Sequence, residues 1–227
     1  MKLFAGTSGY AYKDWKGHFY PEKIAQERML SFYADNLGSV EINNTFYRLP
    51  SKSVLANWRE QVPEGFRFVL KASRRITHQK RLKEADDALG YFLDCSTELG
   101  DRLGALLFQL PSYLRKDIDR LRDFRALLDG ALRAAFEFRH PSWFDDKVYA
   151  GLADAGGALC LAESENDERN PPFEATVDWG YLRLRREAYE GADLEAWAKK
   201  IEAAPWTEAY VFFKHEDAGA GPRMEPV

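Results

Sequence analysis

The chain has 227 residues, of which 45% are hydrophobic and 30% are charged. This balance supports a folded core and excludes a disordered or fibrous chain. With 32 Lys and Arg against 36 Asp and Glu, the formal net charge is −4, which excludes a generally basic coat for nucleic acid but leaves room for a local basic site. Aromatic residues make up 14% of the chain, so their positions relative to polar motifs are informative.

The two cysteines, Cys95 and Cys160, are too few for a disulfide framework, and each lies in an apolar pattern typical of a small core residue. Residues 1–6 enter an apolar strand directly, without the pattern of a secretory signal peptide. No run approaches the roughly 18 consecutive apolar residues of a membrane span. We therefore expect a cytoplasmic protein with no membrane partner.

Short apolar runs that favour β-strands recur along the chain. They are Leu3–Ala5, Ser39–Ile42, Phe66–Leu70, Ala105–Phe108, Ala134–Phe138, Ala158–Leu161, Tyr181–Leu184 and Tyr210–Phe213. Segments with helical spacing separate most of them. Their apolar stripes run through Leu30, Tyr33 and Leu37, through Ala85, Leu89, Phe92 and Leu99, and through Leu121, Phe124, Leu128 and Leu132; further helices are predicted after Ser51, over Asp145–Ala155 and over Leu194–Ala204.

Alternating strands and helices indicate a parallel sheet with helices outside it. Eight strands favour a (β/α)₈ TIM-like barrel, here a compact one, since such barrels typically need about 250 residues. We predict a single domain over residues 1–227, with a doubly wound open sheet as the alternative. The barrel is expected to be irregular, because Glu163–Ala175 shows little helical pattern and Glu216–Val227 is too short for a full closing helix.

The carboxyl ends of the strands in such a barrel converge on one pocket. Polar motifs follow the predicted strands at that end, and all four histidines lie in loops or strand ends on the same rim: His18, His78, His140 and His215. Side chains two residues apart on a strand share a face. The pairs that we expect to point into the barrel mouth are Glu41 with Asn43, Glu137 with Arg139, and Arg183 with Arg185. The intervening Ile42, Phe138 and Leu184 are apolar and should face the helices.

These strand-end motifs resemble one known family. They are Gly6-Thr7-Ser8-Gly9-Tyr10 with Trp15 and Phe19-Tyr20-Pro21, the segment 40–50, Phe108-Gln109-Leu110-Pro111, and Glu137-Phe138-Arg139-His140-Pro141-Ser142-Trp143. Together they are similar to the DUF72 (YecE-like) family over nearly the whole chain. The resemblance implies a TIM-barrel-like fold but no reaction, since the family has no settled function. In family members the seventh strand commonly ends in Arg-Leu-His-Gly, where this chain has Arg-Leu-Arg-Arg at 183–186, so no role of that histidine is carried over.

Two glutamates are candidates for acid/base catalysis. Glu41 and Glu137 come from nearly opposite strands, and two carboxyl groups about 5–10 Å apart suit glycoside hydrolysis. The structural alternative is that each glutamate pairs with an arginine, Glu137 with Arg139 or Arg183, and fixes the rim. His78 and His140 are further candidates for proton transfer.

Cations also arrive at the rim from several strands, and arginines match phosphate and carboxylate bidentately. Their structural role would be to neutralise Glu41 and Glu137. The residues that we predict to bind a substrate are Tyr10, Asn43, Tyr47, Lys71, Gln109, Arg139, Trp143, Arg183, Arg185 and Lys214. The excess of positive charge favours a small anionic molecule or a nucleic-acid fragment as the partner, with rim aromatic rings available for stacking.

No cofactor is predicted. A divalent metal is an alternative, but no His-x-His, His-Glu-x-x-His or Asp-rich spacing occurs, and arginines among the ligands would repel a cation. The sequence thus favours an enzyme acting on a phosphate ester or nucleic-acid fragment, a hydrolase of phosphodiester bonds. A glycosidase-like hydrolase with paired glutamates and a non-catalytic nucleic-acid or metabolite-binding protein remain open. Oligomeric state is not predicted.

Overall fold

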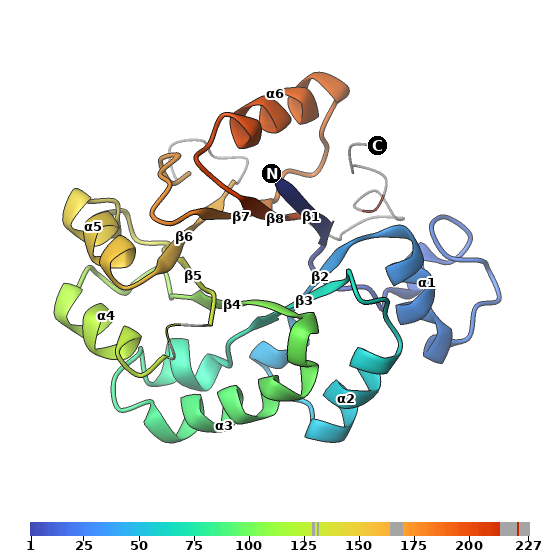
Figure 1. Ribbon diagram of the computed structural model, residues 1–227, viewed down its shortest axis with the longest axis horizontal. Coiled ribbons are helices and arrows are strands. Elements are labelled where there is room, and N and C mark those ends of the chain that lie inside the picture. Colours follow the sequence, from blue (N-terminus) through green and yellow to red (C-terminus); the bar gives the residue numbers. More distant parts are fainter. Residues whose placement is uncertain (129, 131, 164–169, 214–221, 223–227) are drawn as a thin grey trace.

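Eight parallel strands close into a barrel in chain order, as Figure 1 shows. The structure is a computed structural model that describes residues 1–128, 130, 132–163, 170–213 and 222. The strands are β1 (Lys2–Thr7), β2 (Ser39–Ile42), β3 (Arg67–Lys71), β4 (Leu103–Gln109), β5 (Ala134–Glu137), β6 (Gly157–Ala162), β7 (Trp179–Leu184) and β8 (Glu208–Phe213). Pairing of β1 with β8 closes the ring. The predicted TIM-like barrel is confirmed, and the open sheet is excluded.

Helices surround the barrel, and hydrophobic side chains fill the layer between them and the strands. They are α1 (Met29–Asn36), α2 (Lys52–Glu60), α3 (Asp86–Ser96), α4 (Ile118–Arg125), α5 (Asp146–Asp154) and α6 (Gly191–Glu202). Each predicted helix is present, although α4 ends before Leu128 and Leu132. The described part of the connection from β6 to β7, residues 170–178, contains no helix, in agreement with the expected irregularity. The segment after β8 that was expected to lack a full closing helix lies outside the described residues, apart from residue 222.

Apolar side chains fill the interior of the barrel below its mouth, the end at which the strands finish. They are Phe4, Val69, Ala105, Leu107, Ala135, Ala158, Cys160, Trp179, Tyr181, Tyr210 and Phe212. Ile42, Phe138 and Leu184 pack instead in the outer layer against the helices, which confirms their predicted orientation. Because side chains alternate along a strand, the next inward position after Val69 is Lys71 and the one after Ala135 is Glu137.

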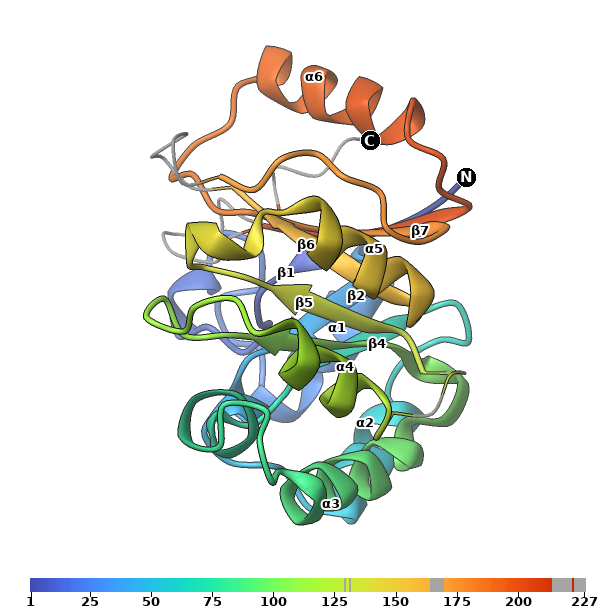
Figure 2. The same ribbon diagram turned by 90° about the vertical axis from the view of Figure 1, so that its left-hand side faces the viewer.

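In Figure 2, β1 starts at the N-terminus on the right, and the parallel strands run towards the left. The barrel mouth, at the carboxyl ends of the strands, therefore lies at the left-hand end. Two glycines shape the rim above β1. Gly6 has no side chain where a Cβ atom would lie 1.8 Å from the backbone oxygen of Ser39, and Gly9 has a φ of +110° that favours glycine. The turn between them places Ser8 over the end of β2.

Candidate functional site

A buried ion network occupies the mouth end of the barrel and is centred on Arg183. Its Nη1 donates to Oε2 of Glu137 at 2.6 Å, and its Nη2 donates to Oε1 of Glu41 at 2.8 Å. All three side chains are almost completely excluded from solvent. A charged group at such a position is tolerated only when it is paired and hydrogen-bonded. One guanidinium therefore joins two glutamates from β2 and β5.

Glu41 accepts hydrogen bonds from three side chains besides Arg183. Its Oε1 accepts from the Ser8 hydroxyl at 2.9 Å and from the Asn43 amide at 3.0 Å, and its Oε2 accepts from the Tyr181 hydroxyl at 2.6 Å. Burial by itself raises the pKa of Glu41, but Arg183 and these hydroxyl donors outweigh burial and hold the pKa below its ordinary value. Glu41 is thus ionised at neutral pH.

Glu137 is held in the same way. Its Oε1 accepts from the Gln109 amide at 2.8 Å and from Nε of Arg139 at 2.9 Å, and Nη1 of Arg185 lies 3.9 Å away. Burial raises the pKa of Glu137, but Arg183, Arg139 and Arg185 together lower it well below its ordinary value. A general acid needs a raised pKa, so neither glutamate fits that role.

Lys71 faces the same cluster from the end of β3. It is 9% exposed, and its Nζ lies 4.6 Å from the centroid of the Phe46 ring. Burial lowers the pKa of Lys71 to about 8, assisted by the positive charge of Arg183 and opposed by the two glutamates. Phe46 also contacts the imidazole of His78 with an edge-to-face distance of 5.0 Å between ring centroids.

His78 lies beside Lys71 and donates to or accepts from the hydroxyl of Thr77 at 2.9 Å. Burial lowers the pKa of His78, and the charges of Lys71, Arg139 and Arg74 lower it further. The imidazole is therefore neutral at physiological pH and is suited to act as a base.

The remaining predicted residues are distributed differently. Asn43 and Tyr10 line a pocket of about 180 Å³ next to the network, where Tyr10 packs against Tyr33 and Trp58. Tyr47 is 73% exposed. Lys214, like His215, lies outside the described residues.

Two predicted site residues have structural roles instead. Trp143 is only 1% exposed, stacks on Phe138 with ring centroids 4.5 Å apart, and donates its indole N–H to the carbonyl of Leu114. The expectation that Trp143 lines the mouth therefore needs correction: its apolar ring packs in the outer layer. His140 caps the short helix 141–143, accepting from the backbone N–H of Ser142 at 3.1 Å. In the described structure, its ring makes no hydrogen bond or ion pair with the network around Glu137.

Sequence reasoning missed three residues of the network. Ser8 and Tyr181 bond Glu41, and Phe46 lies beneath Lys71. Tyr181 precedes Arg183 by two positions on the same strand, so the alternation along β7 contained the signal that places it inward. Ser8 and Phe46 come from loops, and their positions depend on how those loops fold back over the barrel.

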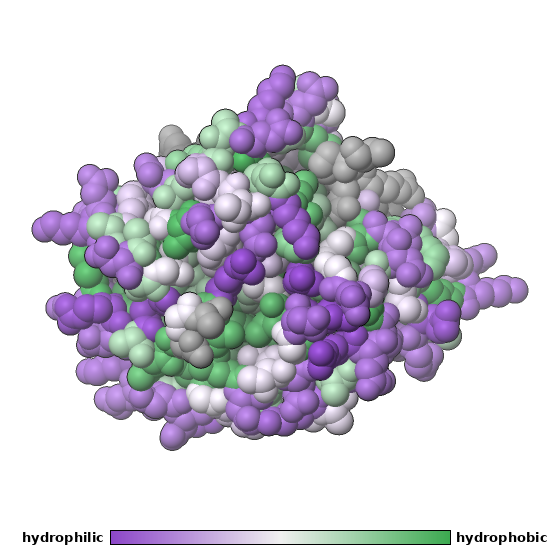
Figure 3. Space-filling view, in the orientation of Figure 1, coloured by the Kyte–Doolittle hydropathy of each residue, from purple (hydrophilic) through white to green (hydrophobic). Residues whose placement is uncertain are grey.

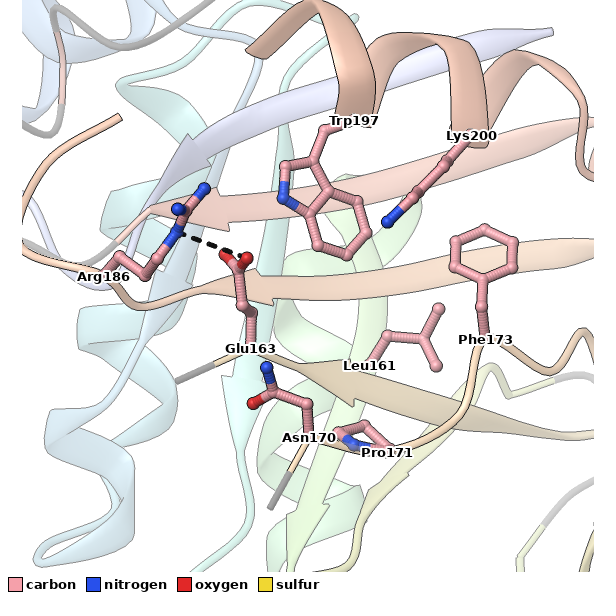
Figure 4. Close-up of a pocket in the computed structure, with 8 residues that line it drawn as sticks. All are labelled: Leu161, Glu163, Asn170, Pro171, Phe173, Arg186, Trp197 and Lys200. Atoms are coloured by element: carbon pink, nitrogen blue, oxygen red, sulfur yellow. Dashed lines mark ion pairs between the residues drawn. The ribbon is translucent and has the colours of Figure 1, made fainter. Parts of the chain in front are cut away.

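Another pocket lies outside the barrel wall, between β6, β7 and α6, and has a volume of about 410 Å³. Figure 4 shows Trp197 and Lys200 of α6 projecting towards it and the ion pair of Glu163 with Arg186 at its edge. None of the network residues lines it, so it is separate from the mouth.

Metal ligands do not gather in the described part of the chain: no group of three or more His, Cys, Asp and Glu side chains there is suited to a metal ion. No helix among the described residues is long and apolar enough to cross a membrane.

Comparison with known sequences agrees with this architecture. Residues 4–225 match the family described as "Protein of unknown function DUF72". The chain belongs to the DUF72 family. It is 36% identical to the UPF0759 protein YecE of Escherichia coli K12 over 116 residues, an alignment that covers 51% of this chain and 43% of YecE. It is 26% identical to the UPF0759 protein YunF of Bacillus subtilis, over 94% of this chain and 78% of YunF.

Solved DUF72 structures share the barrel. A DUF72 protein from Thermotoga maritima superposes with a TM-score of 0.84 at 24% identity, covering 99% of this chain and 96% of that one. A DUF72 protein from Enterococcus faecalis V583 superposes with a TM-score of 0.82 at 19% identity, covering 98% and 92% of the two chains. These similarities show the fold alone. The chemistry of this DUF72 protein has to be argued from its own side chains.

Proposed function

We propose that this DUF72 protein is an enzyme that acts on a small phosphate ester bound at the mouth of its barrel. The observation that carries the proposal is a local excess of positive charge. Four cationic side chains, Lys71, Arg139, Arg183 and Arg185, face two carboxylates, which leaves a formal surplus of two positive charges. A phosphate group compensates such a surplus with charge-assisted hydrogen bonds.

Unused hydrogen-bonding capacity supports a ligand at this place. Among the described residues, the buried Nε of Arg183 and the buried Oδ1 of Asn43 have no hydrogen-bond partner. Arg139 and Arg185 are 38% and 36% exposed at their side chains, so their guanidinium groups can reach an anion that enters the mouth. Buried polar atoms usually have partners, so two unpartnered ones beside exposed guanidinium groups favour a binding site.

The glutamates orient these cations in the proposed site, and His78 and Lys71 supply the groups for proton transfer. Glu41 and Glu137 bond the two terminal nitrogens of one guanidinium, so this group occupies the space between the carboxylates where a glycosidic bond would have to lie. The pKa of both glutamates is also lowered. The geometry therefore gives the glycosidase alternative no support.

A small ester fits the site better than a nucleic-acid fragment. Stacking of bases needs exposed aromatic faces. Trp143 is buried and Tyr10 packs against Tyr33 and Trp58, so Tyr47 is left as the one predicted rim ring with an exposed face, and a single ring supports little base stacking.

Both cysteines are buried and unpaired, which is compatible with a reducing compartment, and we place the protein in the cytoplasm.

Titration with inorganic phosphate and with phosphate monoesters tests this function. Arg185 is the residue to change, because its guanidinium lies 3.9 Å from Glu137 and holds the network less tightly than Arg183 does. Arg185→Gln should weaken phosphate binding by about 10–100-fold, since a hydrogen bond to a charged group contributes about 1.5–3 kcal/mol. Isothermal titration calorimetry measures the affinity, and release of product from the monoesters measures turnover.

Arg122→Gln is the matched control, because Arg122 pairs with Asp119 and Asp123 on the surface of α4. Its phosphate affinity should equal that of the unaltered protein. If Arg185→Gln and Arg139→Gln both bind phosphate normally, the site assignment is wrong. Binding without turnover of any ester would favour a non-catalytic metabolite-binding protein.

A further inference from the structure

Lys71 differs from the other cations of the mouth. Arg183 bonds both glutamates and Arg139 bonds Glu137. In the part of the chain that the structure describes, Nζ of Lys71 has no salt bridge or hydrogen bond, and it lies 4.6 Å from the centroid of the Phe46 ring. Its charge is thus stabilised less than that of its neighbours, although the residue is 9% exposed.

The surroundings of Lys71 make its ammonium group easier to deprotonate than that of an exposed lysine. Burial in a mostly dry site destabilises the ammonium ion, and the fixed guanidinium charges of Arg183 and Arg139 repel it. A lysine amine that is desolvated next to other cations is a nucleophile towards carbonyl groups. Arg183 remains charged in its place, because the two glutamates compensate it.

His78 shares a neighbour with this amine. Nζ of Lys71 lies over the Phe46 ring and the imidazole of His78 meets the same ring edge-to-face, and the charge of Lys71 acts on the imidazole. The hydrogen bond to Thr77 fixes the imidazole orientation. Arg139 and Arg185 lie at the exposed side of the network, where they can hold an anionic group a few atoms away.

We propose that Lys71 forms a Schiff base with an aldehyde or ketone that carries a phosphate group, which Arg139 and Arg185 bind. This inference rests on the proposed function, because it names the class of phosphate ester that the mouth accepts. It assigns to Lys71 a covalent role in addition to the anion-binding role expected from the sequence.

The proposed step balances without a further reagent. The lone pair of the Lys71 nitrogen forms a bond to the carbonyl carbon, the C=O π electrons move to oxygen, and one proton passes from nitrogen to that oxygen to give a carbinolamine. Neutral His78 first takes the proton that the Lys71 ammonium group loses before the attack, and the resulting imidazolium then returns that proton to the hydroxyl, which leaves as water. The product is a protonated imine between Nζ and the former carbonyl carbon, and water reverses the step.

Reductive trapping tests the inference with glycolaldehyde phosphate as the probe. Borohydride, added as the external reductant of the assay, delivers hydride to the imine carbon and converts it into a stable secondary amine. Peptide mass spectrometry then locates the adduct. We expect Lys71 to be labelled at least about tenfold faster than the exposed lysines at neutral pH, because the amine of Lys71 is less protonated than theirs.

Matched probes and variants define the controls. Glycolaldehyde lacks the phosphate and should label Lys71 more slowly, and inorganic phosphate should compete with glycolaldehyde phosphate. Lys71→Arg keeps a positive charge, so it should retain phosphate binding and lose the adduct at residue 71. Lys52→Met removes a surface lysine that pairs with Asp94 and should leave the labelling of Lys71 unchanged.

The outcomes separate this inference from the proposed function. If the protein binds inorganic phosphate but Lys71 is labelled no faster than the exposed lysines, the Schiff-base inference is wrong and the anion site stands. If neither phosphate binding nor preferential labelling is detected, the proposed function fails as well. Equal labelling by glycolaldehyde and its phosphate would contradict the part given to Arg139 and Arg185.

Discussion

At the scale of single residues, the mouth of the barrel depends on Arg183. Its guanidinium is buried between Glu41 and Glu137, and each of the three groups is stable in that position only because the others are charged. Removing one member leaves an uncompensated buried charge, which costs more than the net contribution of the intact network. Stability and the proposed ligand binding therefore depend on the same side chains.

The substitution Glu137→Gln tests this dependence. It leaves one of the two charges that compensate Arg183, so we expect the free energy of unfolding at pH 7 to fall by about 3–5 kcal/mol. Urea unfolding followed by circular dichroism gives the value. The control Asp94→Asn removes an exposed partner of Lys52 and should cost less than about 1 kcal/mol. Equal losses in the two variants would contradict the central role of the network.

The same variant predicts a difference in pH dependence. Glu137 has a folded-state pKa below its ordinary value of 4.5, so the unfolded chain binds the proton first as the pH falls. The stabilising contribution is complete above 4.5 and is lost as the pH decreases towards the folded-state pKa. Between about pH 5 and pH 3, the free energy of unfolding should fall more steeply in the unaltered protein than in Glu137→Gln. Parallel curves would contradict the lowered pKa.

At the scale of elements, the position of β1 against β2 controls the rim. The hydroxyl of Tyr33, in α1, accepts from the backbone N–H of Thr7 and donates to the carbonyl of Ser39, which joins the helix to both strands. This close approach leaves no room for a side chain at Gly6. The geometry of Ser8 above Glu41 follows from that packing, since Ser8 comes directly after β1.

A pair of glycine substitutions separates this packing from general effects on the chain. Gly6→Ala would place a Cβ atom 1.8 Å from a backbone oxygen, so we expect a loss of about 3 kcal/mol or more, at the upper end of overpacking effects. Gly38 directly precedes Ser39, the strand partner of Gly6. A Cβ atom added at Gly38 meets nothing within 4 Å, so Gly38→Ala should be neutral or slightly stabilising. Thermal unfolding compares them. A stable Gly6→Ala protein would refute the close approach.

At the scale of the whole molecule, charge is distributed unevenly. The chain is acidic overall, with a formal net charge of −4, yet the mouth has a positive surplus. Figure 3 views the opposite, N-terminal end of the barrel, where hydrophilic residues cover much of the face. There, charges of both signs meet, as in the ion pair of Arg133 with Glu208. The cations that we propose to bind an anion therefore lie at the mouth end of the barrel.

Salt concentration should accordingly affect binding and stability differently. Raising NaCl from about 0.05 to 0.5 M should weaken phosphate binding several-fold, because mobile ions screen the partly exposed Arg139 and Arg185. The buried pairs of Arg183 are screened less, so the free energy of unfolding should change little. Calorimetric titration and urea unfolding in the same buffers measure the two quantities. Salt-independent phosphate binding would contradict the electrostatic site.

The sequence by itself determined the barrel and the identity of its inward charges. Eight apolar runs with intervening helical periodicity predict the fold, and a period of two along each strand places Glu41, Glu137 and Arg183 inside. Such local patterns are sufficient to predict the fold because, in every parallel barrel, backbone hydrogen bonding makes side chains alternate along a strand and burial selects apolar residues for the strands. Family motifs supported this prediction over nearly the whole chain.

Only the tertiary structure decided which of the polar residues meet. Trp143 follows the same strand-end motif as Arg139, but stacking on Phe138 draws it into the outer layer. Ser8, Tyr181 and Phe46 join the site through contacts between elements far apart in the chain. Burial, and with it the lowered pKa of Lys71, depends on the closure of all strands around the mouth, which no local pattern contains.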